Sequence, residues 1–412
     1  MKGSVKFFTA CISIILIPLF VMYSVSVFFT PSKLKTDKLT NTFLNGSFPL
    51  SLSYSNTNAL AVHADNTSSK NVSAKLMMFN IFPVKEVNIS LEERKYVIPG
   101  GIPFGIRLYT NGLVVTETTS VSSGISESYP AQDAGIKSGD VIRSVNDKTL
   151  TSNEQLLRAV EESDGQPIKI DAIHENSPYS TMITPVFDNS IGKYRAGLYV
   201  RDSCAGIGTM TYIDPSNGSY AGLGHGICDS ESGRLMPLLS GDIVRADITS
   251  VRKSICGSPG SLNGHFNGTT AIGSLLLNSE HGVYGKYYLP DKNAKTIPVA
   301  FKQETVKGGA SLLTSVENNI PLYYDIEIEE ISYNDLNTSK NMIVKVTDER
   351  LLKKAGGIVQ GMSGSPIIQN GRLVGAVTHV FVNDPTRGYA VFAENMLEYS
   401  ENIPQTIYNR AA

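Results

Sequence analysis

Short apolar runs separated by turn-forming residues dominate the chain from Tyr194 onward. Gly, Asn, Asp and Ser cluster between the runs, as they do between neighbouring strands of β-rich proteins. Long helical periodicity is missing, and only the stretch near residues 348–354 predicts a turn or two of helix. Many short strands at this spacing predict a barrel or a sandwich, so the fold class is expected to be mainly β. The strand-like runs cover residues 197–200, 206–213, 242–246 and 271–276.

The N-terminal part of the chain has a different pattern. Residues 7–29 form an apolar stretch of twenty-three residues without one charged side chain. As a helix the stretch would span roughly 35 Å, enough to cross a hydrocarbon core of about 30 Å. A cleaved signal peptide normally has a shorter apolar core of about 7–15 residues. We therefore predict a retained transmembrane helix within residues 1–30, whose orientation is left open by Lys33, Lys35 and Lys38.

Residues 31–73 are rich in Ser, Asn, Thr and Lys and contain only scattered apolar residues. Such a composition buries too little surface to offset the entropy cost of ordering. A strand-like run follows at residues 75–89. The pattern predicts a flexible tether and a lead-in strand over residues 31–90.

Composition adds limits to this picture. At 412 residues the chain is long enough for roughly two or three domains. The net charge of −2 gives no reason to expect a nucleic-acid partner. Cys11 lies in the apolar stretch, so the body holds an odd set of three cysteines, which does not suggest a disulfide framework: Cys204, Cys228 and Cys256.

One short motif carries candidate chemistry, namely Gly361-Met362-Ser363-Gly364-Ser365-Pro366. Glycines on both sides of a serine let the backbone turn sharply and bring its amides close to a reacting group. The amides of Gly361 and Ser363 have the spacing of an oxyanion hole, so Ser363 is the candidate nucleophile. In an α/β-hydrolase the acid and the histidine follow the serine, and too little chain remains here for that order.

The motif resembles the Gly-Asp-Ser-Gly-Gly-Pro signature of chymotrypsin-like serine proteases. Together with Gly222-Leu223-Gly224-His225-Gly226 and an upstream PDZ-like segment, it is similar to the stage IV sporulation protein B peptidase family. The resemblance implies a chymotrypsin-like double β-barrel over residues 190–405, with the active site in the cleft. Met362 replaces the signature Asp that accepts a new N-terminus in zymogen-type proteases, so that mode of activation is not expected.

The base that activates Ser363 must be a histidine within hydrogen-bond reach. His225 stands between two glycines, and the catalytic histidine of the family falls on this position. His265 is expected in a surface turn and His379 on the strand that pairs with substrate. The chain has six histidines in all: His63, His174, His225, His265, His281 and His379.

The acid that orients the histidine is less well defined by the sequence. In the stage IV sporulation protein B family an aspartate about fifteen residues before the serine belongs to the site, which implies Asp348. Chymotrypsin-like enzymes carry their aspartate nearer the histidine, where Asp242 and Asp247 lie. An exposed Asp348 paired with Arg350 or Lys353 is the non-catalytic alternative.

A PDZ domain of α+β type is predicted over residues 91–182. Residues 98–108 have the apolar-Gly-apolar pattern of a carboxylate-binding loop, centred on Phe104, Gly105 and Ile106, and residues 130–142 resemble the following PDZ helix and strand. Ser152 with Gln155 resembles a capping box before a groove helix. In such domains an extended peptide adds to the edge strand while loop amides hold its C-terminal carboxylate. An unused groove, with the domain as a spacer, is the alternative.

The resemblance implies a membrane-tethered extracytoplasmic serine endopeptidase, located between forespore and mother cell. It would cleave its own chain and a membrane-bound regulator of an intramembrane protease, which matures a late sporulation sigma factor. We expect no cofactor and no metal. Two alternatives remain: a catalytically inactive scaffold that acts through the PDZ groove, and a zinc site built from His225, Cys228, Cys256 and His265.

Overall fold

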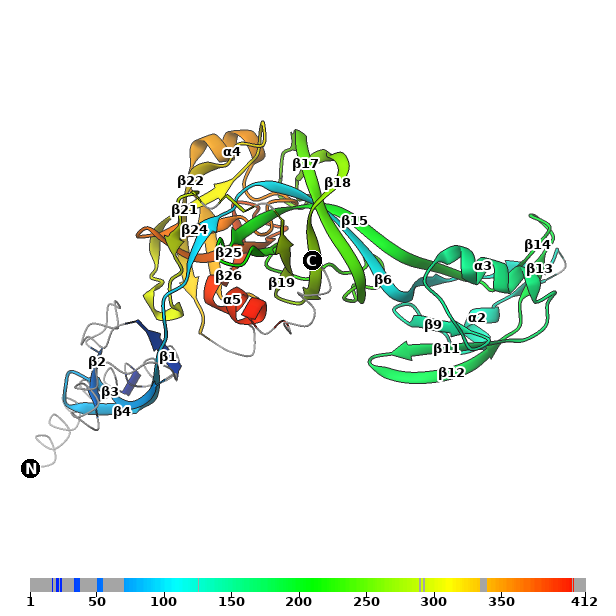
Figure 1. Ribbon diagram of the computed structural model, residues 1–412, viewed down its shortest axis with the longest axis horizontal. Helices are drawn as coiled ribbons and strands as arrows, with labels where there is room; N and C mark the ends of the chain where they lie inside the picture. The colour runs from blue at the N-terminus through cyan, green and yellow to red at the C-terminus, as the bar shows by residue number, and fades with distance from the viewer. Residues whose placement is uncertain are drawn as a thin grey trace, which may run out of the picture.

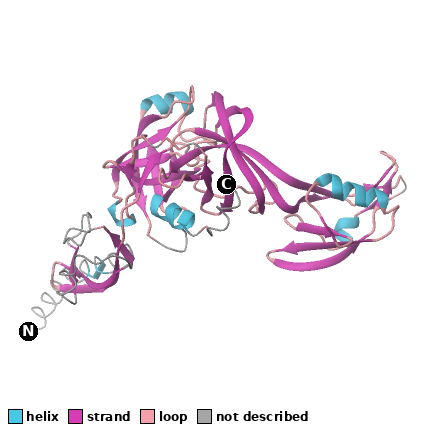
Figure 2. Ribbon diagram, viewed as in Figure 1, coloured by secondary structure: helices cyan, strands magenta, loops and turns pink. Residues whose placement is uncertain are grey.

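The computed structural model describes residues 17, 20–21, 23, 33–37, 50–54, 70–401 except 125, 289, 292 and 334–338, and 403. Strands dominate, with a few short helices (Figure 2), so the prediction of a mainly β fold is confirmed. A small N-terminal sheet lies at one end of the molecule, two β-barrels lie in the middle, and an α+β domain lies at the other end (Figure 1).

The first barrel is a ring of strands that is closed by pairing of β6 with β15. Its interior is apolar because alternate side chains point inward, among them Phe104, Ile106, Met210 and Ile243. The ring runs through β6 (Pro103–Thr118), β17 (Leu238–Arg252), β18 (Ser261–Ser279), β19 (Gly282–Tyr287), β16 (Ser219–Gly222) and β15 (Leu198–Ile213). Two short strands, β5 (Tyr96–Pro99) and β20 (Ile297–Pro298), extend it beside β15.

The second barrel is closed as well, in the strand order β21-β22-β23-β26-β25-β24. Its core includes Leu312, Ile326, Val344 and Phe392. The strands are β21 (Gly308–Thr314), β22 (Leu322–Ile331), β23 (Met342–Val346), β24 (Pro366–Gln369), β25 (Arg372–Val380) and β26 (Arg387–Phe392). Helix α4 (Glu349–Ala355) lies between β23 and β24, α5 (Ala393–Glu401) follows β26, and the 3-10 turn η2 (Lys302–Glu304) precedes β21.

The α+β domain is inserted between β6 and β15, which each continue from the first barrel into it (Figure 1). Its helix α3 (Asn153–Glu162), expected from the sequence, buries Leu156 and Val160 against the domain core. The other elements are β7 (Val121–Ser122), β8 (Glu127–Ser128), α2 (Pro130–Asp133), β9 (Val141–Val145), β10 (Lys148–Thr149), β11 (Ile168–His174), β12 (Ser177–Ile183), β13 (Val186–Asp188) and β14 (Lys193–Arg195). The first barrel thus begins before this domain, at β5 and β6, and not near residue 190.

Within the predicted tether, the described residues form a four-stranded sheet of order β1-β4-β3-β2. The strands are β1 (Lys33–Thr36), β2 (Leu50–Tyr54), β3 (Lys70–Met78) and β4 (Phe82–Leu91). Alternate side chains are buried, including Leu76 and Val87, which gives the sheet its own core. Ion pairs join this part of the chain to the segments that flank the second barrel: Lys35 of β1 pairs with Glu398 of α5 at 2.8 Å, and Arg94, just after β4, pairs with Glu304 of η2 at 2.7 Å. The prediction of a flexible tether is therefore wrong for residues 33–37, 50–54 and 70–73, whereas the predicted strand at residues 75–89 is present as the hairpin of β3 and β4.

In the part of the chain that the structure describes, no helix has the length and apolar character needed to cross a membrane. The predicted transmembrane stretch, residues 7–29, lies outside the described residues apart from positions 17, 20–21 and 23.

Candidate active site

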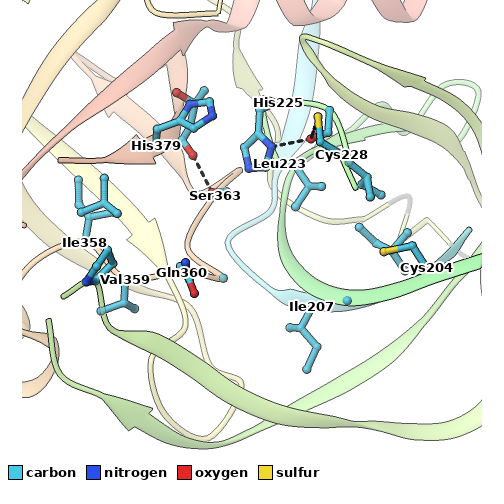
Figure 3. Close-up of a pocket in the computed structure, with 18 of the residues that line it drawn as sticks. Cys204, Ile207, Leu223, His225, Cys228, Ile358, Val359, Gln360, Ser363 and His379 are labelled. Atoms are coloured by element: carbon cyan, nitrogen blue, oxygen red, sulfur yellow. Dashed lines mark hydrogen bonds between the residues drawn. The ribbon is translucent and has the colours of Figure 1, made fainter. Parts of the chain in front are cut away.

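A cavity of about 490 Å³ opens where the two barrels meet (Figure 3). Ser363 and His225 both line it, from the second and the first barrel respectively. Most of the other lining side chains are apolar, and none is a carboxylate: they include Ile207, Leu223, Ile358, Val359, Val380 and Val382. The structure therefore brings the predicted nucleophile and the predicted base to one apolar cleft.

The loop that carries Ser363 is held in place by close backbone packing. Gly364 has φ +93°, and a Cβ there would lie 2.0 Å from the carbonyl oxygen of Thr209 and 2.4 Å from the amide nitrogen of Leu223. Only glycine fits this position. Met362, at the place of the signature Asp, is fully buried in the core of the second barrel, so apolar packing fixes this side of the loop.

Strand β15 of the first barrel also fixes the loop. The Thr209 amide donates to the carbonyl oxygen of Ser363 at 3.1 Å, and the Thr209 hydroxyl donates to that of Gly361 at 2.8 Å. The Thr211 hydroxyl donates to the carbonyl oxygen of Gly364 at 2.8 Å. One strand thus holds three backbone carbonyls around the nucleophile.

These contacts leave two amides available at the cavity. The Met362 amide donates to Val359 O, and the Gly364 amide donates to Val377 O. Within the described part of the chain, neither the Gly361 amide nor the Ser363 amide donates a hydrogen bond to a backbone acceptor. Two unoccupied N–H groups two residues apart have the spacing that an oxyanion hole needs, so the loop can stabilise a tetrahedral intermediate.

His225 is positioned by a tight turn with left-handed backbone at Leu223 (φ 65°) and Gly224 (φ 69°). Its Nδ1 lies 2.8 Å from the carbonyl oxygen of Gly226, and if Nδ1 carries the proton, Nε2 is left as an acceptor. Burial lowers the pKa of His225 below its ordinary value of 6.5. The imidazole is therefore neutral at neutral pH and can serve as a base.

His379 lies beside His225, with ring centroids 4.8 Å apart (Figure 3). It belongs to β25, directly after Thr378. Burial, followed by repulsion from His225 and Lys340, lowers the pKa of His379 to about 4. The sequence predicts His379 on the strand that pairs with substrate, but no spacing in the sequence indicates that it contacts the base.

None of the three candidate aspartates contacts His225. Asp348 caps α4, accepting from the Arg350 amide at 2.8 Å, and pairs with the Arg350 guanidinium at 2.7 Å. Asp242 pairs with Arg107 at 2.6 Å, and Asp247 accepts from Asn319 at 2.6 Å. The structure thus corrects the placement of Asp348: as a helix cap it lies outside the cavity, and the group within hydrogen-bond distance of the imidazole Nδ1 is the carbonyl oxygen of Gly226.

The predicted peptide-binding residues also lie elsewhere than expected. Phe104 and Ile106 are buried in the core of the first barrel, and Gly105 pairs with Ile207 on one side and Val244 on the other. A strand paired at both edges cannot accept a further strand. The assignment of a carboxylate-binding loop to these three residues is therefore wrong.

The inserted domain has a groove at a different place, between α3 and the start of β15. This cavity of about 330 Å³ is lined by Leu156 and Leu157 of α3, by Gly197 just before β15, and by Leu198 at the start of that strand. On their other side, residues 198–201 pair with β6, and among the described residues no strand pairs with the edge beside α3. Residues 196–198 are Ala-Gly-Leu and share the apolar-Gly-apolar pattern that predicted a carboxylate-binding loop at residues 104–106.

The cysteines are spread over separate places. Cys204 and Cys228 line the cavity, whereas the Cys256 thiol lies 3.2 Å from the carbonyl oxygen of Asn383. His265 sits opposite Asp247 in the β17–β18 ladder. In the described ranges, no group of three or more His, Cys, Asp or Glu side chains could hold a metal ion, so the four residues of the zinc alternative do not come together.

Two β-barrels with a serine, a histidine and two free amides at their junction are the architecture of a serine peptidase. The sequence profile of the SpoIVB peptidase S55 family matches residues 192–397, half of the 412-residue chain, and a PDZ profile matches residues 121–172. The chain belongs to the SpoIVB peptidase S55 family, is a serine peptidase, and contains a PDZ domain.

Three solved structures are similar to parts of the chain. The PDZ domain of the SdrC-like protein of Listeria monocytogenes is 19% identical, covering 22% of this chain and 90% of that one, at a TM-score of 0.19. The HtrA-type protease AlgW with a decapeptide is 12% identical, covering 49% and 54%, at a TM-score of 0.30. The inactive form of the Rv3671c protease is 13% identical, covering 48% and 84%, at a TM-score of 0.25.

Proposed function

We propose that the chain is a serine endopeptidase in which Ser363 is the nucleophile and His225 the general base. The observation that supports these roles is that both side chains line one cavity beside the unoccupied amides of Gly361 and Ser363. His225 receives its orientation from the Gly226 carbonyl, so the pair works as a dyad without a carboxylate.

Peptide hydrolysis then follows the usual two-step acyl transfer. His225 takes the hydroxyl proton of Ser363 as Oγ attacks the scissile carbonyl carbon, and the amides of Gly361 and Ser363 bind the resulting oxyanion. The imidazolium gives its proton to the leaving amine, which leaves an acyl-enzyme. Water, deprotonated by His225, releases the acid and restores the serine.

The cellular role follows the family. The chain would be tethered to a membrane by its N-terminal apolar stretch, act outside the cytoplasm between forespore and mother cell, and process itself. Cleavage of a membrane-bound regulator would release an intramembrane protease that matures a late sigma factor. The uncharged stretch at residues 7–29 and the name of the family support this part of the proposal.

The geometry also supports regulation through the PDZ groove. An extended peptide added to β15 at residues 198–201 would bind the same strand whose Thr209 and Thr211 hold the Ser363 loop. A shift of this strand on peptide binding would move the carbonyls of Gly361 and Gly364, and with them the oxyanion amides. The groove and the catalytic loop are thus linked by one continuous strand.

The chemistry is tested by labelling with a serine-directed phosphonate and mapping the modified residue. We expect the label on Ser363, and we expect Ser363→Ala and His225→Ala to lose several orders of magnitude in peptide cleavage while remaining folded. His265→Ala, an exposed histidine outside the cavity, is the matched control. Ordinary cleavage by folded Ser363→Ala protein would refute the assignment, and an absence of label in the wild type would favour the inactive scaffold.

Self-processing is tested by N-terminal sequencing after expression. Wild-type protein should be cut within residues 31–90, whereas Ser363→Ala should keep its N-terminus. A protease cleft takes an extended chain, so the cut should fall outside the paired strands β3 and β4. Equal shortening of both proteins in a host without other proteases would mean that the cleavage is not its own.

A further inference from the structure

Three large apolar side chains are exposed at the tip of the β3–β4 hairpin. Phe79 is 43% exposed, Ile81 67% and Phe82 50%. Further along the hairpin, alternate apolar residues such as Leu76 and Val87 are buried in the sheet core. The tip therefore adds little to the stability of its own sheet, and its apolar side chains form a patch on the surface.

The turn at this tip is strained by its sequence. Phe79 and Asn80 have φ values of 55° and 59°, and the Ile81 amide donates to the carbonyl oxygen of Met78 at 3.1 Å, which closes a β-turn within the three-residue hairpin loop of residues 79–81. Asn and Gly are the residues that adopt this conformation readily. A bulky Phe in it costs about 1–2 kcal/mol. An aromatic side chain kept at such a position points to a role outside folding.

One residue of the N-terminal apolar stretch, Tyr23, contacts the same sheet. The hydroxyl of Tyr23 donates to the carbonyl oxygen of Val84 in β4 at 3.2 Å. In the same N-terminal segment Ile17 is 62% exposed and Phe20 71% exposed. These residues belong to the uncharged stretch that is proposed as the membrane anchor. The hairpin that Tyr23 contacts lies at the end of the molecule that is far from the PDZ domain (Figure 1).

We propose that Phe79, Ile81 and Phe82 insert into the interfacial region of a lipid bilayer, as a second membrane contact beside the anchor. Aromatic and aliphatic side chains on a polar scaffold favour this depth. Lys75 and Lys85 lie roughly 10 Å behind the tip, at the level of anionic headgroups, with Glu86 opposite Lys75.

The inference rests on the proposed membrane anchoring and not on the proposed peptidase chemistry. A second membrane contact would set the orientation of the protein relative to the bilayer. A single helix leaves a tethered body free to tilt, whereas a second contact fixes its angle to the bilayer. Because ion pairs of Lys35 and Arg94 join this part of the chain to the segments that flank the second barrel, the catalytic cavity would be held at a set distance from the membrane.

The test uses tryptophan fluorescence, because the chain contains no Trp. Ile81→Trp is made in the full-length chain, which is then reconstituted in nanodiscs with and without brominated phosphatidylcholine. We expect a blue-shifted emission that is quenched by the brominated lipid. Tyr323→Trp, 53% exposed on the second barrel, should be neither shifted nor quenched. Labelling by the serine-directed phosphonate should be the same in all variants.

Two further variants separate the possible failures. Phe20→Trp reports the anchor: if it is quenched and Ile81→Trp is not, the anchor stands and the hairpin contact is refuted. A blue shift at position 81 without quenching would mean that a protein surface covers the tip, which also overturns the proposal. Adding Phe79→Asn to Ile81→Trp relieves the turn strain, so we expect a higher Tm together with weaker quenching; unchanged quenching would remove Phe79 from the contact.

Discussion

The hydroxyl of Ser363 donates a 2.7 Å hydrogen bond to the carbonyl oxygen of Thr378 on β25. A hydroxyl has one hydrogen, so it cannot donate at the same time to His225. Attack on a substrate therefore requires rotation of the serine side chain into another staggered rotamer. The structure shows a resting arrangement in which the nucleophile is held by the strand beside the cavity.

The first prediction concerns this rotation. In a phosphonate adduct of the wild type, Oγ should leave Thr378 O, and the phosphoryl oxygen should lie within hydrogen-bond distance of the Gly361 and Ser363 amides. A crystal structure of the adduct measures both distances. An adduct oxygen that points away from these two amides would assign the oxyanion hole to other groups.

The second prediction concerns Asp348, which caps α4 and pairs with Arg350. Asp348→Ala should lower the free energy of unfolding by about 1 kcal/mol, the usual cost of a lost N-cap, and leave phosphonate labelling nearly unchanged. Urea unfolding and labelling rates measure the two effects. Asp242→Asn, at another of the three candidate aspartates, serves as the comparison. A large loss of labelling with ordinary stability would return Asp348 to the active site.

Because Asp348 is ionised in the folded state, we also predict that its contribution to stability depends on pH. Arg350 lowers the pKa of Asp348 from 3.8 to about 2, so the ionised carboxylate stabilises the folded state. Its contribution is fully present above pH 3.8 and is lost as the pH falls through about 2. The stability gap between wild type and Asp348→Ala should therefore stay constant from neutral pH into mild acid and then narrow. A gap that widens on acidification would contradict this sign.

The sequence alone identifies some of the site residues, because the residues that mark them lie beside them in the chain. Ser363 and His225 were found from glycines on either side, since close packing of a catalytic loop leaves room only for glycine. Gly105 has the same local signal, but it serves close packing against Phe266 and Val244 in the barrel. Which glycine borders an open edge depends on strand pairing between distant segments, and the sequence does not contain that pairing explicitly.

Other features were missed for related reasons. The group within hydrogen-bond distance of His225 Nδ1 is a backbone carbonyl oxygen, which has no side-chain signature. The polar composition of residues 31–73 predicted a tether, yet the buried face of a small sheet needs only scattered apolar residues, such as Leu34 and Leu52. In both cases the local structure depends on tertiary contacts, which the composition of the segment does not reveal.

The third prediction tests the glycine that joins the two barrels. Gly364→Ala places a Cβ 2.0 Å from Thr209 O, so we expect a loss of at least about 2 kcal/mol in unfolding free energy and no phosphonate labelling. Gly371→Ala is the matched control, because it also has positive φ (+73°) but no heavy atom within 4 Å of the added Cβ. It should cost about 1 kcal/mol and keep full labelling. Equal effects would mean that the close approach at Gly364 is unimportant.

The fourth prediction tests the position of the PDZ groove. Leu157 on α3 is 53% exposed and lines the groove, so Leu157→Glu should remove apolar contact and repel a C-terminal carboxylate. Calorimetry with peptides that end in apolar residues should show at least about tenfold weaker binding, or about 1.4 kcal/mol. Leu322→Glu, 48% exposed on β22, is the control.

Gly105→Glu gives a contrasting result in the same experiment. A Cβ at Gly105 would lie 2.6 Å from the Phe266 ring, so this variant should fail to fold and should lose labelling together with binding. If Gly105→Glu folds, keeps its labelling and selectively loses peptide binding, the carboxylate site lies on β6 after all.

The last prediction concerns the two histidines at the cavity. Burial lowers the pKa of His225, so the neutral base persists below pH 6.5 and the acid limb of the kcat/KM profile should lie below that value. His379 covers one side of His225 at a ring distance of 4.8 Å, and its own pKa of about 4 keeps it neutral throughout this range. His379→Ala should admit water to His225, raise the pKa of the base and move the acid limb to higher pH, whereas His265→Ala should leave the profile unchanged. If the acid limb of the kcat/KM profile moved to lower pH in His379→Ala, His379 would stabilise the imidazolium form of His225 instead of excluding water from the ring.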